Sequence, residues 1–139
     1  MNNDVLQAKS ALNGHTIALC KGDTLTVCDK NGIRPMLDFI SDGNDLSGFS
    51  VADLVVGKAV ATLFVYAKIK CVYSKVMSKP ALEYLQSHGI DVQYDSLVEN
   101  IMNRAGDGIC PMEQCVQNID DASVAYAALK DKIMQMQNK

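Results

Sequence analysis

The stretch that decides the fold is residues 50–67, SVADLVVGKAVATLFVYA. Ser50 and Asp53 have the spacing of a capping box, in which Asp53 helps to cap the first turn of a helix. The pattern therefore predicts one long helix from Ser50 to about Ala67. Beyond its first turn, only three residues interrupt the apolar sequence: Gly57, Lys58 and Thr62. A helix that is apolar on nearly all sides must be covered on nearly all sides, so we expect it in the middle of the fold.

Short β-rich runs lie on both sides of this stretch. HTIALC (15–20) and TLTVCD (24–29) flank a Gly-containing connection, which predicts a hairpin. Two further strands are predicted at 69–76 and 90–94, and shorter helices at about 3–13, 35–41, 78–89, 96–102, 110–116 and 121–136. Strands separated by helices pair in parallel through right-handed crossovers. We therefore predict a three-layer α/β/α sandwich with a mixed sheet, formed by residues 1–139 as a single domain.

Composition narrows the possible partners and the compartment. The 139 residues carry 13 Lys and Arg against 16 Asp and Glu, a formal net charge of −3, which argues against binding to nucleic acid. The longest apolar stretch contains two charged residues and is shorter than a membrane span. The five cysteines are an odd number, and the first residues do not have the pattern of a secretory signal. We expect a cytoplasmic protein with reduced thiols.

Three motifs resemble one known family. SVADLVVGKA (50–59), SKPALE (78–83) and IMNRAGDGICPME (101–113) are similar to the domain-of-unknown-function family 1893. The resemblance covers residues 4–130 and implies a fold of the cytidine deaminase-like type. The family has no assigned reaction, so the resemblance predicts the fold but not the function.

The deaminase zinc motif is missing from the sequence. A zinc deaminase has a His or Cys before x-Glu at the start of its central helix and Pro-Cys-x-x-Cys at the start of the next. Residues 50–53 read SVAD and residues 78–83 read SKPALE, which contain none of these ligands. We expect no bound metal and no other cofactor.

Cys110 is the most suggestive residue in the chain. It comes directly before Pro111, so it occupies the N-cap of a short helix, where the helix dipole favours a thiolate. The alternative is a small buried cysteine with no chemical role. In the central helix, Lys58 would need a partner if buried, whereas a long side chain can also reach solvent.

The fold that the resemblance implies brings helix N-termini together in a cleft. By this analogy Ser50, Ser78, Asn103, Arg104 and Gly108 are candidate ligand-binding residues, and Arg104 would receive an anionic group.

Three functions stay open at this point. The chain could be a small-molecule enzyme with Cys110 as nucleophile and Lys58 and Asp53 as acid–base or electrostatic helpers. It could instead be a non-catalytic module that binds or senses a nucleotide-like or other small anionic ligand. In the third, residues 121–139 pack against a second copy, and the chain is a structural subunit of a homo-oligomer.

Overall fold

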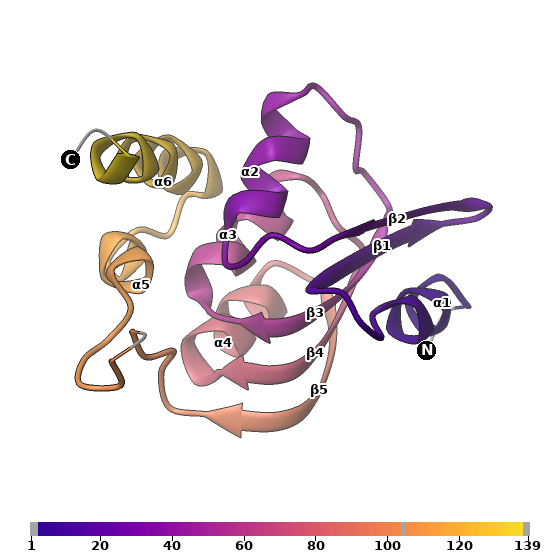
Figure 1. Cartoon of the computed structure of the whole chain (residues 1–139), viewed down its shortest axis with the longest axis horizontal. Helices are drawn as coiled ribbons and strands as arrows, with labels where there is room; N and C mark the ends of the chain where they lie inside the picture. Colours follow the sequence, from indigo (N-terminus) through magenta and orange to yellow (C-terminus); the bar gives the residue numbers. More distant parts are fainter. Residues whose placement is uncertain (1–2, 104, 138–139) are drawn as a thin grey trace.

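The computed structural model describes residues 3–103 and 105–137 of the chain (Figure 1). The helices in this part are α1 (Asn3–Ala11), α2 (Arg34–Ser41), α3 (Lys58–Tyr66), α4 (Lys79–Ser87), α5 (Pro111–Val116) and α6 (Ala122–Gln137). The strands are β1 (Ile17–Lys21), β2 (Thr24–Cys28), β3 (Ser50–Val56), β4 (Cys71–Ser78) and β5 (Asp91–Val98).

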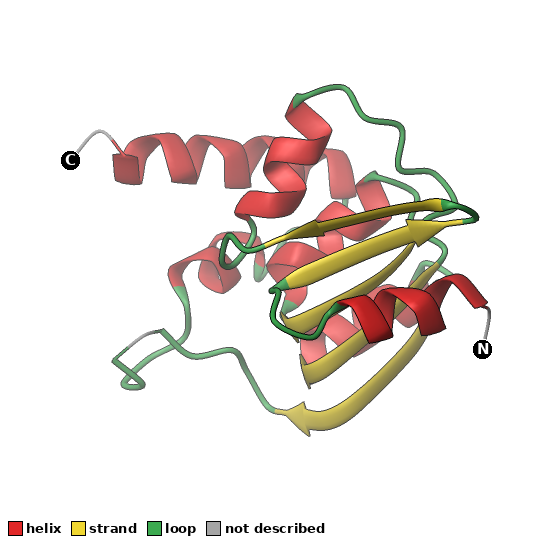
Figure 2. Cartoon of the chain, turned by 45° about the vertical axis from the view of Figure 1, so that its right-hand side comes forward, coloured by secondary structure: helices red, strands yellow, loops and turns green. Residues whose placement is uncertain are grey.

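The strands form one mixed sheet in the order β2-β1-β3-β4-β5. β1 pairs antiparallel with both β2 and β3, whereas β3, β4 and β5 run parallel. Helix α1 covers one face of the sheet, and the other helices lie on the opposite side (Figures 1 and 2). The predicted hairpin and the predicted three-layer α/β/α sandwich with a mixed sheet are therefore confirmed.

The predicted long helix at 50–67 is wrong in its first third. Residues Ser50–Val56 form the central strand β3, Gly57 is the N-cap of α3, and the helix begins at Lys58. A central parallel strand is buried on both faces and is apolar without alternation, so its pattern matches that of a buried helix. Asp53 is consequently a strand residue and caps no helix.

The second correction concerns residues 90–102. β5 extends to Val98 and takes up the start of the helix predicted at 96–102. The segment that follows is irregular, with a single antiparallel bridge between Met102 and Ile109. β5 is an edge strand, and its side chains are mostly exposed. Because an edge strand needs no continuous apolar pattern, the sequence did not indicate how far this strand extends.

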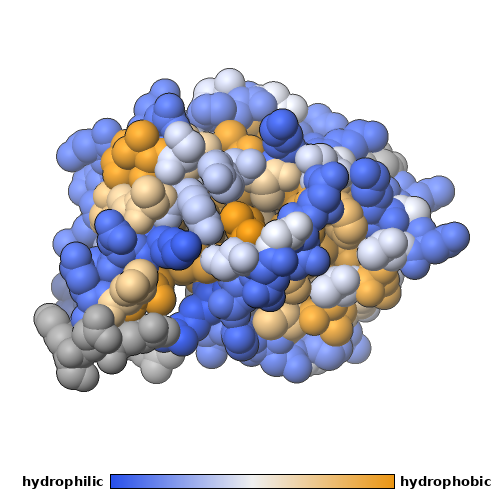
Figure 3. Space-filling view, turned by 90° about the horizontal axis from the view of Figure 1, so that it is seen from above, coloured by the Kyte–Doolittle hydropathy of each residue, from blue (hydrophilic) through white to orange (hydrophobic). Residues whose placement is uncertain are grey.

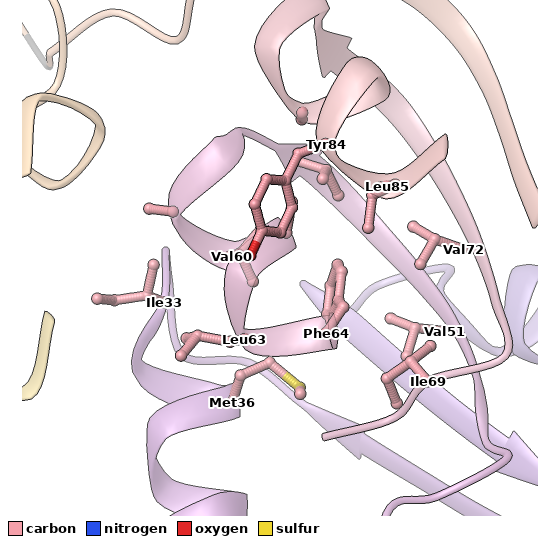
Figure 4. Packing of buried hydrophobic residues seen from close by; sticks show 14 of the residues in the cluster. Ile33, Met36, Val51, Val60, Leu63, Phe64, Ile69, Val72, Tyr84 and Leu85 are labelled. Atoms are coloured by element: carbon pink, nitrogen blue, oxygen red, sulfur yellow. The ribbon is translucent and has the colours of Figure 1, made fainter. Parts of the chain in front are cut away.

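The two faces of the sheet are packed differently. Small side chains of the sheet, including Ala18, Cys20 and Ala52, lie beneath α1. On the other face, large side chains surround α3, with Phe64 and Leu63 fully buried (Figure 4). On the molecular surface seen from above, apolar side chains form several patches with hydrophilic residues between them (Figure 3). The core places the first turn of α3 at the carboxyl end of β3.

Candidate active site

The candidate site lies where β3 ends and α3 begins. In this structure the side chain of Glu113, from α5, reaches the first turn of α3. Its Oε1 accepts the backbone N–H of Lys58 at 2.7 Å, and its Oε2 accepts the backbone N–H of Ala59 at 2.8 Å. These two N–H groups have no partner within the helix. Glu113 therefore caps α3 from a distant part of the chain.

Gly57 leaves the space that this carboxylate fills. A Cβ atom at position 57 would lie 2.2 Å from Oε1 of Glu113. The φ angle of Gly57 is −103°, which any residue can adopt. The absence of a side chain at position 57 thus makes room for Glu113 and is not needed for the backbone conformation.

Burial and hydrogen bonding act in opposite directions on Glu113. Burial raises the pKa of its carboxyl above the ordinary value, while the two backbone N–H groups and the nearby Lys58 ammonium lower it; the effect of burial is the larger. Lys58 Nζ lies 3.3 Å from the carbonyl oxygen of Gln117 and 5.6 Å from the ring centroid of Tyr84. Lys58 therefore has the partners that its place in an apolar helix requires.

Two cavities meet at Glu113. The smaller, of about 190 Å³, is lined by Asp53 and Cys110 together with Gly57 and apolar side chains. The larger, of about 400 Å³, is lined by Lys58 and Tyr84 among others. Glu113 lines both. The structure thus brings Cys110 and Asp53 to one cavity and places the Lys58 side chain in the other.

Asp53 is the most strongly perturbed group of the smaller cavity. Its side chain is only 7% exposed. Burial raises the pKa of Asp53 to about 8, although the backbone N–H groups of Val55 and Leu54 act to lower it. A carboxyl with this pKa is mostly protonated at neutral pH and can either donate or accept a proton there.

A short loop holds Cys110 in place. The N–H of Cys110 donates to the carbonyl of Ile101 at 3.0 Å, and its thiol is half-buried and forms no disulfide. In the same loop the N–H of Asn103 donates to the carbonyl of Gly108 at 2.8 Å, and the Asn103 amide donates to Asp107. Asn103 and Gly108 therefore shape the loop that carries Cys110.

The other predicted binding residues lie elsewhere. Ser50 is buried at the beginning of β3, opposite Cys20 and Cys71, and lines neither cavity. Ser78 is the N-cap of α4, where its hydroxyl accepts the N–H of Ala81 at 3.2 Å. Arg104 lies outside the described residues.

The first zinc ligand of the deaminase motif would stand at the start of the central helix, which was expected at residues 50–53. The helix begins later, and the residues at its actual start, Gly57-Lys58-Ala59, also contain no His or Cys. Among the described residues, no three His, Cys, Asp or Glu side chains are grouped so that they could hold a metal ion. Within the same part of the chain, no helix combines the length and the apolar character that crossing a membrane requires.

Glu113 and Gly57 are the site residues that sequence reasoning missed. Glu113 stands three residues after Cys110, which places both on one side of a helix, and this spacing was the available signal. Its partner could not be identified, because the N–H groups that it binds lie 55 and 54 residues away in the chain.

Comparison with solved structures found one strong match and two weaker ones. A crystal structure of a DUF1893 family protein, TM1506 from Thermotoga maritima, matches with a TM-score of 0.84 and 26% identity, over 95% of this chain and 92% of that one. dCMP deaminase from the cyanophage S-TIM5 matches with a TM-score of 0.48 and 12% identity, over 68% of this chain and 99% of that one. A diaminohydroxyphosphoribosylaminopyrimidine deaminase/5-amino-6-(5-phosphoribosylamino)uracil reductase from T. maritima matches with a TM-score of 0.45 and 15% identity, over 66% and 35% of the two chains.

Comparison with sequence families confirms the resemblance seen in the motifs. None of the curated proteins is significantly similar to this sequence. The DUF1893 (TM1506) profile, described as a domain of unknown function, matches residues 6–133. The chain therefore belongs to the DUF1893 family.

Proposed function

We propose that this chain is an enzyme that acts on a small carbonyl compound in the smaller cavity, with Cys110 as the nucleophile and Asp53 as the proton carrier. One observation carries the proposal. A half-buried free thiol and a buried carboxyl with a pKa of about 8 line the same cavity of about 190 Å³. Perturbed titratable groups that share a cavity are typical of active sites.

The chemistry needs only water as a second reactant. The sulfur of Cys110 attacks the carbonyl carbon of an ester, thioester or amide, and a C–S bond forms as the bond to the leaving group breaks. The proton of the thiol passes by way of Asp53 to the leaving group. Water then attacks the acyl-enzyme: the C–S bond breaks, the hydroxyl of the water completes a carboxylic acid, and its remaining proton restores the thiol by way of Asp53. The net reaction is hydrolysis.

The cavity limits the size and polarity of the substrate. Its volume is close to that of an engineered cavity of roughly 150 Å³ that accepts benzene. Most of the lining is apolar, with Ile33, Val60 and Ile101 as examples, and its titratable side chains besides Cys110 are the carboxyls of Asp53 and Glu113. We therefore favour an uncharged substrate with a small apolar group.

In this proposal Lys58 contributes only through Glu113. Its ammonium contacts Gln117 and Tyr84 at the larger cavity, and its charge stabilises the Glu113 carboxylate. The proposal also places the chain in the cytoplasm, since a nucleophilic thiol must stay reduced and all five cysteines are free of disulfides.

The test is acylation by small p-nitrophenyl esters, followed by mass spectrometry of the intact chain. We expect one acyl group on Cys110 and a burst of p-nitrophenolate. Cys110→Ala should abolish both, whereas Cys115→Ala should change neither, because Cys115 lies on the same short helix but lines neither cavity. Asp53→Asn should slow turnover at least about 100-fold, the usual scale of proton-transfer catalysis. Equal acylation of Cys110 and Cys115, or full turnover by Cys110→Ala, contradicts the proposal.

A second candidate is a module that binds a small molecule without chemistry, and the larger cavity supports it. This cavity is about twice the volume of the other and holds Tyr84 and several polar side chains. Glu83, Glu113 and Asp120 outnumber Lys58 there, so the charge favours a neutral or cationic ligand over the anionic one expected from the sequence. Ligand binding that survives Cys110→Ala and fails in Tyr84→Ala would favour this function.

A further inference from the structure

We infer that Glu113 is a positioning residue, whose carboxylate fastens α5 to the first turn of α3 and so fixes the Cys110 thiol in the smaller cavity. The inference deepens the proposed function and rests on it for its consequence in catalysis. The structural part of the inference is that Glu113 tethers α5 to α3. This part depends only on the hydrogen bonds of Glu113 and not on the proposed reaction.

Three kinds of contact hold α5 on the fold: buried side chains, the carboxylate of Glu113, and the ammonium of Lys58, which donates to the carbonyl of Gln117 at the end of α5. The helix is six residues long, and its buried side chains are Met112 and Val116. The segment before it, from Glu99 to Cys110, has mostly exposed or half-buried side chains among its described residues. The Glu113 carboxylate accepts two short hydrogen bonds, which are a substantial part of the polar attachment of this helix, because charge-assisted bonds are about twice as strong as neutral ones.

The position of Cys110 follows that of Glu113. Cys110 is the N-cap of α5 and Glu113 is its third residue, so one turn of helix connects them. Residues three apart on a helix lie on the same side, and both line the smaller cavity. A shift of the carboxylate away from α3 therefore moves the thiol relative to Asp53, which is fixed in the central strand β3.

A substitution at Gly57 can displace the Glu113 carboxylate without changing its chemistry. The Cβ of an alanine at position 57 would lie within 2.8 Å of all three carboxylate atoms of Glu113. The backbone at Gly57 tolerates alanine, and the end of a glutamate side chain can swing aside. Gly57→Ala thus displaces the tether but keeps its charge, whereas Glu113→Gln removes the charge and one acceptor.

The experiment compares these two variants and their double variant with the unmodified chain. NMR hydrogen exchange at the amides of Lys58 and Ala59 reports the tether, and the pH profile of iodoacetamide labelling reports Cys110. We expect at least about tenfold faster exchange of both amides in Gly57→Ala, and of at least one of them in Glu113→Gln, which keeps a single acceptor; this is the scale of one lost hydrogen bond to a charged group. The double variant should be no worse than the more severe single one, because both changes remove the same interaction.

Labelling separates positioning from a general loss of stability. Cys110 should label several-fold faster in both variants, while Cys20 and Cys71 in the core stay protected. The labelling rate in Gly57→Ala shows the effect of displacing the carboxylate with its charge retained. Acylation turnover should fall in both variants with KM little changed. Asp38→Asn is the matched control, because it also removes one carboxylate charge, from an exposed ion pair with Lys30, and Asp38 lines neither cavity.

Each outcome separates this inference from the proposed function. Unchanged exchange of both amides overturns the tether, whatever the activity. Faster exchange with unchanged labelling of Cys110 overturns the positioning role and leaves Glu113 as a cap of α3. If the unmodified chain is not acylated but exchange and labelling change as expected, the proposed function fails and Glu113 still positions Cys110.

Discussion

The first residue of β3 and the part of the strand from Asp53 onward, here called its core end and its cavity end, both bury a polar side chain, but in different surroundings. At its first residue, Ser50 lies between Cys20 of β1 and Cys71 of β4 within the core. At the middle of the strand, Asp53 lines a cavity, and the strand then leads into Gly57, which lines the same cavity. Burial at the core end places Ser50 away from both cavities, whereas burial at the cavity end raises the pKa of a carboxyl that lines a cavity. Parallel sheets commonly hold their sites at the carboxyl ends of strands.

The largest effect should come from replacing the carboxyl at the cavity end of the strand. The pKa of Asp53 is about 8 in the folded chain and 3.8 as an ordinary value. Because the folded value is the higher, the stability provided by neutral Asp53 is complete below about pH 4 and is lost as the pH rises to about 8. At about 1.4 kcal/mol per pH unit, the loss is on the order of 5 kcal/mol.

Asp53→Asn should therefore remove this slope and make the chain more stable than the unmodified protein at pH 8. Urea unfolding from pH 4 to about pH 9 measures it. Ser50→Ala, at the other end of the strand, is the control and should leave the pH dependence unchanged. A flat stability profile for the unmodified chain would remove the proposed difference between the two ends.

The next effect concerns the thiols at the two ends. Burial raises the pKa of Cys20 and Cys71, and nearby carboxylates add to this. These two thiols should react with iodoacetamide only when the chain opens, whereas Cys110 is half-buried. We expect Cys110 to label about 1,000-fold faster, as openings that cost a few kcal/mol imply. Labelling of Cys20 or Cys71 within tenfold of Cys110 would show that the core end is not closed.

The smallest effect tests Ser78, which stands at the carboxyl end of the neighbouring strand. Ser78→Ala should cost about 1 kcal/mol by thermal unfolding, because α4 loses its N-cap. Ser78→Thr keeps a capping hydroxyl and should retain most of that stability. Neither change should alter the labelling of Cys110. A several-fold change in that rate would place Ser78 in the site after all, and would extend the reactive end from β3 to β4.

The sequence was sufficient for the fold class but not for the boundary at Gly57. The β-rich runs on both sides of a Gly-containing connection predicted the hairpin, and the alternation of strands and helices predicted the layers. SVADLVV has no alternation because β3 is buried on both faces. A strand of this kind and the first turns of a buried helix have the same apolar pattern, so the two were joined in one predicted helix.

The candidate site was predicted in part for a related reason. Cys110 and Asp53 were identified from a helix start and from a charge in an apolar stretch, and both line one cavity. The predicted role of Asp53 as a cap was wrong, because the helix begins later. Lys58 was expected beside Cys110, but its side chain turns to the other cavity. The role of Glu113 was not predicted, because the N–H group that it binds belongs to Lys58, 55 residues away. A local sequence pattern contains no information on so distant a contact.

That separation along the chain also has a consequence for the order of folding. The cap of α3 closes only when a segment 55 residues further on has docked, and long loops close late because their closure entropy must first be offset by other contacts. The sheet and most of α3 can form before α5 arrives, so the folding transition state should lack the Glu113 contact. The reverse of this step is a local unfolding of α5. It would separate Cys110 and Glu113 from Asp53 while the sheet stays intact.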